Sequence, residues 1–264
     1  MLSLAGISKT FNLDTPSPNP ALRGIDLHLE PGEFVTIIGS NGAGKSTLLN
    51  AIAGVFPIDS GRIVVDGQDI TNWPEHKRAS LIGRVFQDPM MGTAASMSIE
   101  ENLAMAAKRG ERRGFARGVN VNSRARFREM LADLGLGLEN RLSDKVKLLS
   151  GGQRQSLTLL MATISRPKLL LLDEHTAALD PKTAQQVAEL TNQIVKSAGL
   201  TVLMVTHNME HALNTGTRTV MMHEGQIIFD VSGDKRAKMT VADLLNEFSR
   251  LRGESLADDR LLLG

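Results

Sequence analysis

Apolar runs of strand length, bounded by turn residues, recur along the chain. Residues 34–38, Phe-Val-Thr-Ile-Ile, form a run that is typical of a strand buried on both faces. Residues 22–29 instead alternate apolar and polar side chains, which predicts a half-buried strand. The same criteria predict further strands at 4–11, 62–67, 82–86, 169–172, 201–205, 218–222 and 226–230.

Helical periodicity fills most of the intervals between these strands. Apolar side chains that recur every three or four residues predict helices at 48–53, 99–107, 124–134, 154–164, 182–198, 209–213 and 241–251. Strands that alternate with helices favour an α/β fold with a mainly parallel sheet covered on both faces. The Pro- and Asn-rich residues 14–20 break the pattern and are predicted to form a loop.

The character of the chain changes between residues 88 and 148. Methionine and alanine become frequent and strand-forming residues become rare, which predicts a helical subdomain inserted into the α/β core. This segment holds a basic run in which only Glu111 opposes the cations Lys108, Arg109, Arg112, Arg113, Arg117, Arg124, Arg126 and Arg128. Such a run is usually a solvated face, and contact with anionic lipid headgroups or an acidic partner is the alternative.

Composition removes several classes of protein. Thirty Lys and Arg residues balance 29 Asp and Glu residues, so a general role in binding nucleic acid gains no support. The chain has no cysteine, which excludes disulfides and cysteine-ligated zinc and fits a reducing cytosol. Residues 1–6 lack the pattern of a signal peptide, and the apolar runs are too short to span a bilayer. We therefore expect a soluble cytoplasmic protein whose membrane contacts come through a partner.

A glycine-rich stretch follows the buried strand at 34–38. It fits the phosphate-binding loop pattern of glycine, four residues and then Gly-Lys-Ser. It comprises Gly39, Ser40, Asn41, Gly42, Ala43, Gly44, Lys45, Ser46 and Thr47. Glycines let successive N–H groups converge on an anion, and the following helix adds its dipole. Lys45 is expected to reach the β- and γ-phosphates of a nucleotide, and the Ser46 hydroxyl to bind Mg²⁺. A plain turn is the alternative, and the strand–loop–helix context favours the nucleotide site.

Two carboxylates follow another buried strand. Residues 169–172 are four leucines, and Asp173 and Glu174 come directly after them. The C-terminal ends of parallel strands line the crevice in which α/β sheets bind ligands. Asp173 is expected to hold Mg²⁺ through water, and Glu174 to polarise the attacking water. Alone, the pair would indicate a solvated acidic turn, but the phosphate loop upstream favours catalysis.

A short motif decides between families of nucleotide-binding proteins. It consists of Leu149, Ser150, Gly151, Gly152 and Gln153. The glycines free the backbone for the approach of an anion, and Ser150 can cap a helix. A turn with a helix cap would explain the motif in isolation. Its place about twenty residues before the two carboxylates makes that explanation weak. Here the sequence resembles the ATP-binding cassette (ABC) ATPases, whose signature motif is LSGGQ.

The resemblance covers residues 2–230 and implies further site residues. Phe11 matches the aromatic residue that stacks on adenine, although a core phenylalanine would fit the sequence nearly as well. Gln87 matches the glutamine that contacts Mg²⁺ and water and links the core to the helical subdomain. His207 matches the histidine that contacts the γ-phosphate. Residues 177–180 match the loop that crosses to the second subunit.

The resemblance also implies a fold and a domain organisation. The fold is that of a P-loop (RecA-like) NTPase, with a mainly parallel sheet, an antiparallel β subdomain and an inserted helical subdomain. Residues 1–87 and 165–232 are expected to form the nucleotide-binding core. Residues 88–164 are expected to form the helical signature subdomain, and residues 233–264 a C-terminal helical extension.

The sequence departs from the family pattern at a few positions. His175 stands where proline is common after the two acids, and Ala177 stands where serine is common. The helix after the signature also lacks the basic residue that is usual within residues 156–165. None of these changes removes a catalytic group, and the first two concern the loop through which subunits communicate.

Membership of this family would imply several partners. Each ATP, with its Mg²⁺, lies between the phosphate loop of one subunit and the signature of another, which implies a head-to-tail homodimer. ATP closes the dimer, hydrolysis reopens it, and the helical subdomain passes the motion to membrane-spanning permease subunits. Residues 174–184 and 221–225 resemble an importer group linked to aromatic or hydrophobic amino acids. That group implies an extracytoplasmic solute-binding protein and a peripheral location on the inner face of the cell membrane.

Two other classes share part of the pattern. A non-transport ABC ATPase of cofactor assembly or repair would share every motif, although repair types usually carry long coiled-coil insertions that this sequence lacks. A small GTPase or a nucleotide kinase would explain the phosphate loop but not residues 149–153. The guanine-binding motif Asn-Lys-x-Asp is also absent from the sequence. Co-purification with a membrane protein would separate a transporter subunit from the non-transport types.

Overall fold

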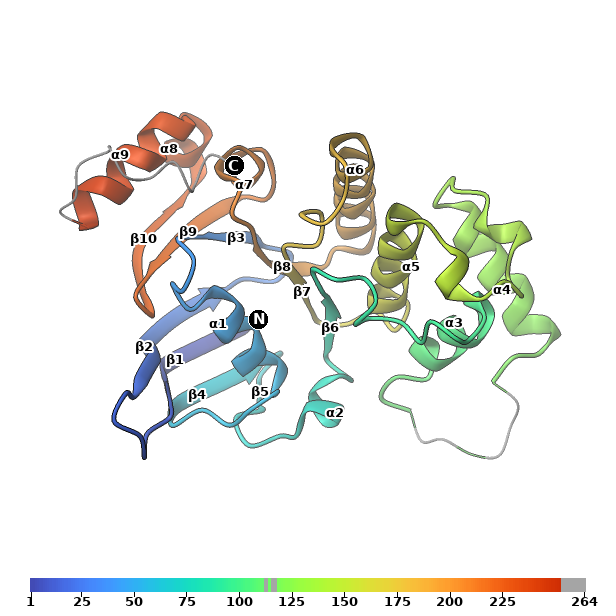
Figure 1. The fold of residues 1–264 in the computed structure, drawn as a ribbon, viewed down its shortest axis with the longest axis horizontal. Coiled ribbons are helices and arrows are strands. Elements are labelled where there is room, and N and C mark those ends of the chain that lie inside the picture. Colours follow the sequence, from blue (N-terminus) through green and yellow to red (C-terminus); the bar gives the residue numbers. More distant parts are fainter. Residues whose placement is uncertain (112–113, 115–117, 253–264) are drawn as a thin grey trace. The chain divides into compact units, whose positions relative to one another are not determined.

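The computed structural model describes residues 1–111, 114 and 118–252, which fall into two compact units (Figure 1). The first unit combines residues 1–78 with the chain from residue 200 onward, and the second holds residues 79–199. Arg112, Arg113 and Arg117 of the basic run lie outside the described residues, as do residues 253–264 of the expected C-terminal extension. The domain boundaries given above stay a prediction.

The first unit contains an antiparallel sheet with strand order β2-β1-β4-β5. Its strands are β1 (Leu2–Phe11), β2 (Asn19–Leu29), β4 (Ser60–Val65) and β5 (Gln68–Asp69). The alternation in β2 works as predicted, because Leu22, Ile25, Leu27 and Leu29 are buried while the polar residues between them are exposed. β5 was not predicted, since its two residues are too few for a pattern to show.

One loop prediction was wrong at its end. β2 begins at Asn19, so Asn19 and Pro20 pair with Phe11 and Thr10 although residues 14–20 were predicted to be loop. Because β2 lies at the edge of its sheet, the missing N–H of Pro20 need not interrupt a ladder of hydrogen bonds.

A second group of strands in the first unit is centred on β3. The strands are β3 (Phe34–Ile38), β8 (Thr201–Val205), β9 (Arg218–His223) and β10 (Gln226–Ser232). β3 pairs in parallel with β8 on one side and β9 on the other, and β10 pairs antiparallel with β9. Every residue of β3 and β8 is buried, as their uninterrupted apolar runs predict.

The first unit also contains helices. They are α1 (Lys45–Ala53), α2 (Glu75–Arg78), α7 (Met209–Asn214), α8 (Gly233–Ala237) and α9 (Val241–Arg252). Ile38 of β3 and Met221 of β9 share one apolar cluster with Phe248 of α9. α2 and α8 were missed by the sequence analysis because four and five residues are too short to display helical periodicity.

The second unit joins one parallel strand pair to a group of helices (Figure 1). Its elements are β6 (Ile82–Val85), α3 (Ile99–Ala107), α4 (Val121–Ala132), the 3₁₀ turns η1 (Leu138–Asn140) and η2 (Val146–Leu148), α5 (Gly151–Thr163), β7 (Leu169–Asp173) and α6 (Pro181–Ala198). α3, α4 and α5 share an apolar core around Leu103, Phe127 and Leu157. The predicted change to helical structure after residue 88 is therefore present.

Two helices of this unit begin three residues earlier than the periodicity indicated. α4 begins at Val121, where Asn120 and Ser123 form a reciprocal capping box, and α5 begins at Gly151, where Ser150 and Gln153 do the same. A capping box satisfies exposed N–H groups in a helix's first turn through polar side chains. The first turn therefore carries no apolar periodicity, and the periodicity locates only the later turns.

One cation of the basic run has a structural role. Arg124 on α4 donates to both carboxylate oxygens of Glu100 on α3, with Nε 2.6 Å and Nη2 2.5 Å from their partners. This bidentate geometry is the strong form of a charge-assisted hydrogen bond. It holds α4 against α3, so Arg124 does not belong to a purely solvated face.

The second unit depends on a close contact between α5 and α6. A β-carbon added at Gly152 would overlap the Cγ2 methyl group of Thr183, in the first turn of α6. Gly152 is buried, and the two helices can approach here only because it has no side chain. Glycine at this place therefore serves helix packing as well as any role in the signature motif.

We expect Gly152→Ala to destabilise the protein by about 2 kcal/mol, because overpacking forces α5 away from α6. Thr183→Ser removes the obstructing methyl group, so the double variant should be at least as stable as the wild type, since alanine favours a helix over glycine by about 1 kcal/mol. Urea denaturation of the two single variants and the double variant measures this. A double variant as unstable as Gly152→Ala alone would refute the packing argument.

Candidate functional site

The glycine-rich stretch forms the predicted turn between β3 and α1. Gly39 has φ 151° and Gly44 has φ 95°, conformations that favour glycine. A β-carbon at Gly39 would overlap the carbonyl oxygen of Met222, and one at Gly44 would lie 2.5 Å from the carbonyl oxygen of Ala21. The loop thus lies in close contact with two neighbouring backbone segments. These contacts fix its shape before any ligand binds.

Lys45 lies across this loop. Its side chain is buried, and Nζ donates to the carbonyl oxygens of Gly39 at 2.7 Å and Ser40 at 3.1 Å. The N-cap of α1 is Gly44, so no side chain caps this helix among the described residues. A phosphate group here would meet an ammonium group, a helix N-terminus and the N–H groups of a glycine-rich turn.

His207 lies at the same end of the strands as the phosphate loop. Ile37 of β3 pairs with Val205 of β8, and the Thr206 N–H donates to the Ile37 carbonyl at 3.1 Å. His207 therefore leaves β8 where Gly39 leaves β3. The Asn208 side chain then caps α7 and fixes the direction of the chain after the histidine. The structure thus brings His207 and the phosphate loop to one edge of the first unit.

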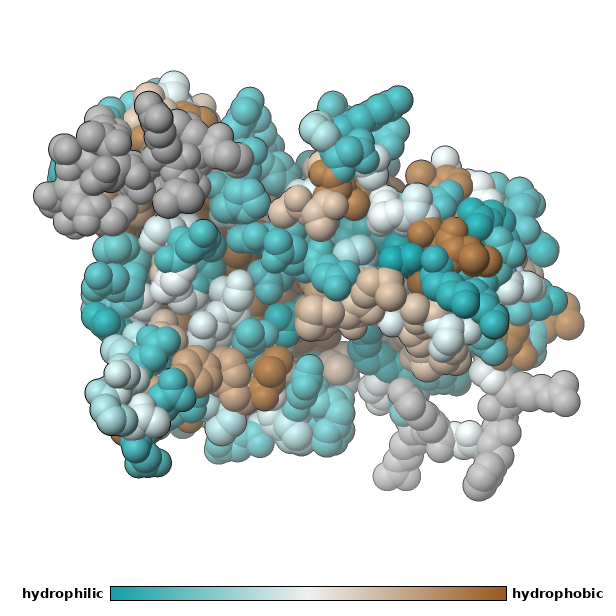
Figure 2. Space-filling model, viewed as in Figure 1, coloured by the Kyte–Doolittle hydropathy of each residue, from teal (hydrophilic) through white to brown (hydrophobic). Residues whose placement is uncertain are grey.

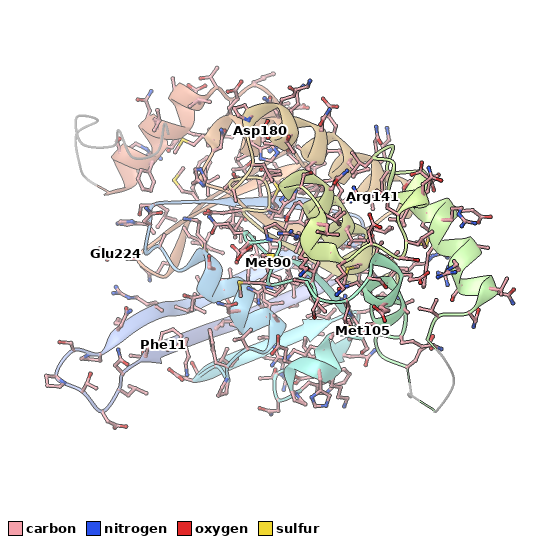
Figure 3. The ribbon with its side chains drawn as sticks, turned by 45° about the vertical axis from the view of Figure 1, so that its right-hand side comes forward. Phe11, Met90, Met105, Arg141, Asp180 and Glu224 are labelled. Carbon is pink, nitrogen blue, oxygen red and sulfur yellow. The ribbon has the colours of Figure 1, made fainter. Side chains whose placement is uncertain are left out.

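Phe11 occupies the end of β1, where it pairs with Asn19 (Figure 3). Its ring meets that of Phe56 edge to face, with 5.1 Å between centroids. Lys9 Nζ lies 5.6 Å from the Phe11 centroid and donates to Asp59 at 2.7 Å. That hydrogen bond holds the pKa of Asp59 below its usual value. Phe11 is half-buried, which fits a stacking platform better than a residue of the core.

In the second unit, the two carboxylates follow β7 as predicted. Asp173 is the last residue of β7, and Glu174 begins the loop that leads to α6. The Glu174 backbone is left-handed, with φ 43°. This conformation is uncommon for a residue with a side chain, and Asn12, Asp66, Arg166 and Glu224 share it in this chain. It turns the chain sharply at the residue expected to polarise water.

The loop after Glu174 is anchored at both ends. The Ala177 N–H donates to the Glu174 carbonyl at 2.9 Å, and Asp180 caps α6 by accepting from the Thr183 N–H at 3.1 Å (Figure 3). The buried His175 lies 3.1 Å from the Thr191 hydroxyl of α6. That hydroxyl gives its one proton to the Val187 carbonyl at 2.7 Å, so His175 must donate through Nε2.

Gln87 follows β6 and is exposed, at the start of an irregular segment. The signature helix contacts the chain on either side of it, at the Phe86 backbone and at the Met90 side chain. Gln155 of α5 is fully buried and donates to the Phe86 carbonyl at 3.2 Å. Arg154 donates to the thioether of Met90 at 2.8 Å and also to the carbonyls of Val146, Lys147 and Leu149. Gln87 and the signature are therefore parts of one connected structure.

The signature motif itself begins α5. The Ser150 hydroxyl accepts from the Gln153 N–H at 3.3 Å, and the Gln153 side chain accepts from the Ser150 N–H at 3.2 Å. Ser150 and Gly151 are exposed, whereas Gly152 is buried against α6. The motif therefore presents a capped helix N-terminus on the surface of the second unit, as an anion site contributed to a partner would require.

Sequence reasoning missed Arg84 in β6. Its Nη2 lies 3.5 Å from Asp173 Oδ2, and its guanidinium lies over the Phe86 ring, 4.4 Å from the centroid. A charged residue inside an otherwise apolar strand was the available signal. Gln155 was missed for a different reason, since a polar residue in a helix pattern gives no sign that it will be buried.

The donor set predicted for Mg²⁺ consists of oxygen atoms. Ser46 offers a hydroxyl group, Asp173 a carboxylate and Gln87 an amide carbonyl, all of which suit a hard cation. Among the residues that the structure describes, no group of three or more His, Asp or Glu side chains could hold a metal ion. Mg²⁺ is typically bound through one or two protein groups together with phosphate oxygens and water, so these residues fit it.

The site residues divide between the two units. The first unit brings together the phosphate loop, Lys45 and His207, with Phe11 at the end of β1. The second brings together Gln87, residues 150–153, Asp173 and Glu174. The assignment of these residues to one nucleotide site stays a prediction.

Comparisons with known proteins agree with the motifs. A family model described as ABC transporter matches residues 22–177. The tyrosine transport ATP-binding protein of Clostridioides difficile (strain R20291) is 45% identical over 248 residues, which cover 94% of this chain and 98% of that protein. The methionine import ATP-binding protein MetN of Corynebacterium efficiens is 36% identical over 84% of this chain, which spans 60% of MetN.

A solved structure agrees as well. The dimeric, post-hydrolysis state of an ATP-binding cassette bound to ADP and Pi matches with a TM-score of 0.76 and 28% identity, over 88% of this chain and 98% of that one. The predicted fold class, a P-loop NTPase with a parallel core and antiparallel strands, is thereby confirmed. The chain belongs to the ABC transporter family, as one of its ATP-binding and ATP-hydrolysing cassettes.

Proposed function

We propose that this ATPase energises the import of an aromatic amino acid, tyrosine above all, through separate membrane permease subunits. One observation carries the proposal: the relative named for tyrosine transport is 45% identical over nearly the whole length of both chains. Relatives named for methionine and for spermidine/putrescine import are 36% and 38% identical, and they support import as the direction. No helix in the described part of the chain is long and apolar enough to cross a bilayer.

The proposed mechanism uses two copies of the chain, packed head to tail. Lys45 and the loop N–H groups would bind the β- and γ-phosphates of ATP, and Ser150 with its helix N-terminus would meet the γ-phosphate from the partner copy. Ser46, Gln87 and Asp173 would hold Mg²⁺, which neutralises charge on the phosphates when bound. The dimeric cassette structure that this chain resembles supports the arrangement.

The same mechanism gives the remaining residues their roles. Glu174 would take a proton from the attacking water, and its strained backbone would fix the direction of its carboxylate. His207 would contact the γ-phosphate, and Phe11 would stack on adenine. A solute-binding protein outside the membrane and a peripheral position at its inner face complete the proposal.

We expect a strain of the source organism that lacks this gene to lose high-affinity uptake of radiolabelled tyrosine. The wild-type gene should restore uptake, whereas Lys45→Ala should not, because the only cation placed within the phosphate loop is removed. Competition with unlabelled phenylalanine, tryptophan, methionine and spermidine measures the selectivity. Unchanged tyrosine uptake in the deletion strain would overturn the assigned solute, and loss of methionine or spermidine uptake instead would name a different one.

Glu174→Gln should separate binding from hydrolysis. The amide keeps the size of the side chain but cannot accept a proton from water, so we expect turnover to fall at least about 100-fold while ATP still binds. The variant should accumulate as an ATP-dependent dimer in size-exclusion chromatography. Adding Ser150→Arg should abolish that dimer by placing bulk and charge against the partner's phosphate. A Glu174→Gln variant that stays monomeric at saturating ATP would count against the head-to-tail arrangement.

The segment after Gln87 is the proposed docking surface for the permease. Met90 and Met91 are exposed by 42% and 69%, so neither fills the core of the second unit. Figure 2 shows apolar side chains interrupting the hydrophilic surface of this unit, and Met105 and Leu148 are exposed there as well. Methionine adapts to irregular apolar partners. Met90 is labelled in Figure 3, and the hydrogen bond that Arg154 donates to it connects this surface with the signature helix.

Replacing both Met90 and Met91 with Asp should leave the isolated subunit folded, because both side chains are exposed. It should also stay active as an ATPase, because an Asp at position 90 can still accept the hydrogen bond that Arg154 donates to Met90. The same change should prevent co-purification with membrane proteins and abolish tyrosine uptake, since two unpaired charges would oppose the docking of an apolar permease helix on this surface. Val121→Asp is the matched control, because Val121 is also an exposed apolar residue of the second unit. Full assembly and uptake in the double variant would place the docking surface elsewhere.

A further inference from the structure

Strand register brings Arg84 and Asp173 together. β6 and β7 are parallel, and Arg84 pairs with Leu171. Side chains of paired residues lie on the same face of a sheet, and so do side chains two residues apart on one strand. Asp173 therefore shares a face with Leu171 and Arg84, one step nearer the end of the strand. The register therefore places both side chains on one face, within reach of each other.

The surroundings of this pair strengthen the interaction. The side chains of Arg84 and Asp173 are 12% and 14% exposed, and Nη2 lies 3.5 Å from Oδ2. The guanidinium also rests against the Phe86 ring, 4.4 Å from its centroid, which restricts its motion. A charge pair that is largely removed from water is screened less than a surface pair, so the positive charge of Arg84 acts strongly on Asp173.

We propose that Arg84 is a positioning residue for Asp173. It acts as a counter-ion that neutralises the Asp173 carboxylate before nucleotide binds, and it opposes the binding of a divalent cation to that carboxylate. The proposal rests on the role of Asp173 as a Mg²⁺ ligand given under the proposed function. A cation at Asp173 meets the charge of Arg84 at close range, and the repulsion lowers its affinity. Because of Arg84, the metal binds well at Asp173 only when the phosphate oxygens of a nucleotide bind it as well.

The test measures how strongly Mg²⁺ and ADP favour each other. The dissociation constant of ADP is determined by calorimetry in EDTA and in saturating Mg²⁺, and the ratio of the two values is the coupling. Arg84→Met removes the charge but keeps a long side chain against the Phe86 ring. We expect the coupling ratio to rise about tenfold in this variant, and the melting temperature without metal to fall because Asp173 loses its counter-ion.

Two further variants separate charge from packing. Arg84→Lys keeps the charge and should keep the wild-type coupling ratio. Arg62→Met removes the β4 arginine from its exposed pair with Asp69 of β5 and should leave the ratio unchanged. If Arg84→Met does not fold, Arg84→Gln replaces it, because the amide can still donate to the carboxylate without a charge. A folded variant with an unchanged or smaller ratio would overturn the proposal.

Asp173→Asn distinguishes this inference from the site assignment on which it rests. If Asp173 holds the metal, the coupling ratio should fall in this variant, whatever Arg84 does. A fall with Asp173→Asn but no rise with Arg84→Met keeps the site and rejects the counter-ion. An unchanged ratio with Asp173→Asn rejects Asp173 as a metal ligand, and the counter-ion role with it.

Discussion

The parallel pairing of β3 with β8 and β9 is the constraint on which the nucleotide-binding half of the structure depends. Every residue of β3 is buried, so a shift in register would place its apolar side chains against wrong neighbours. That register decides which loops end together. The phosphate loop leaves β3 where His207 leaves β8, and the backbone at Met222 of β9 closes on Gly39. The buried strand β3 and its neighbours thus fix the positions of the polar groups in the loops that follow them.

In the second unit, too, buried strands position polar side chains, and hydrogen bonds from side chains position the rest. β6 and β7 direct Arg84 and Asp173 onto one face, while the chain after them is held by side chains rather than by a sheet. Gln155 connects the signature helix to the Phe86 backbone, and Arg154 connects it to the Met90 side chain. A change at Met90, in the proposed docking surface, can therefore reach the signature helix through the hydrogen bond that Arg154 donates. This physical connection is what an ATPase that drives a separate membrane protein requires.

The sequence predicted most of the fold because its patterns are those of burial. Uninterrupted apolar runs located β3, β7 and β8, and the motifs located the phosphate loop and the carboxylates. What it could not predict depends on tertiary contact. Pro20 is part of β2 only because β2 is an edge strand, and Gln155 is buried and bonded to Phe86 only because α5 packs near the end of β6. α4 and α5 begin earlier than predicted, because capping side chains start each helix and a polar first turn shows no apolar periodicity.

His175 gives the loop after Glu174 a property that a proline would not. Proline restricts its own backbone, so its effect is local and survives when neighbouring structure opens. His175 is held instead by the Thr191 hydroxyl in the middle of α6. The loop therefore keeps its shape only while α6 is folded, and the loop and α6 should unfold locally as one cooperative unit. Amide hydrogens of the loop and of α6 should then exchange with solvent at a common rate, so that a loss of order in α6 also releases the loop that begins at Glu174.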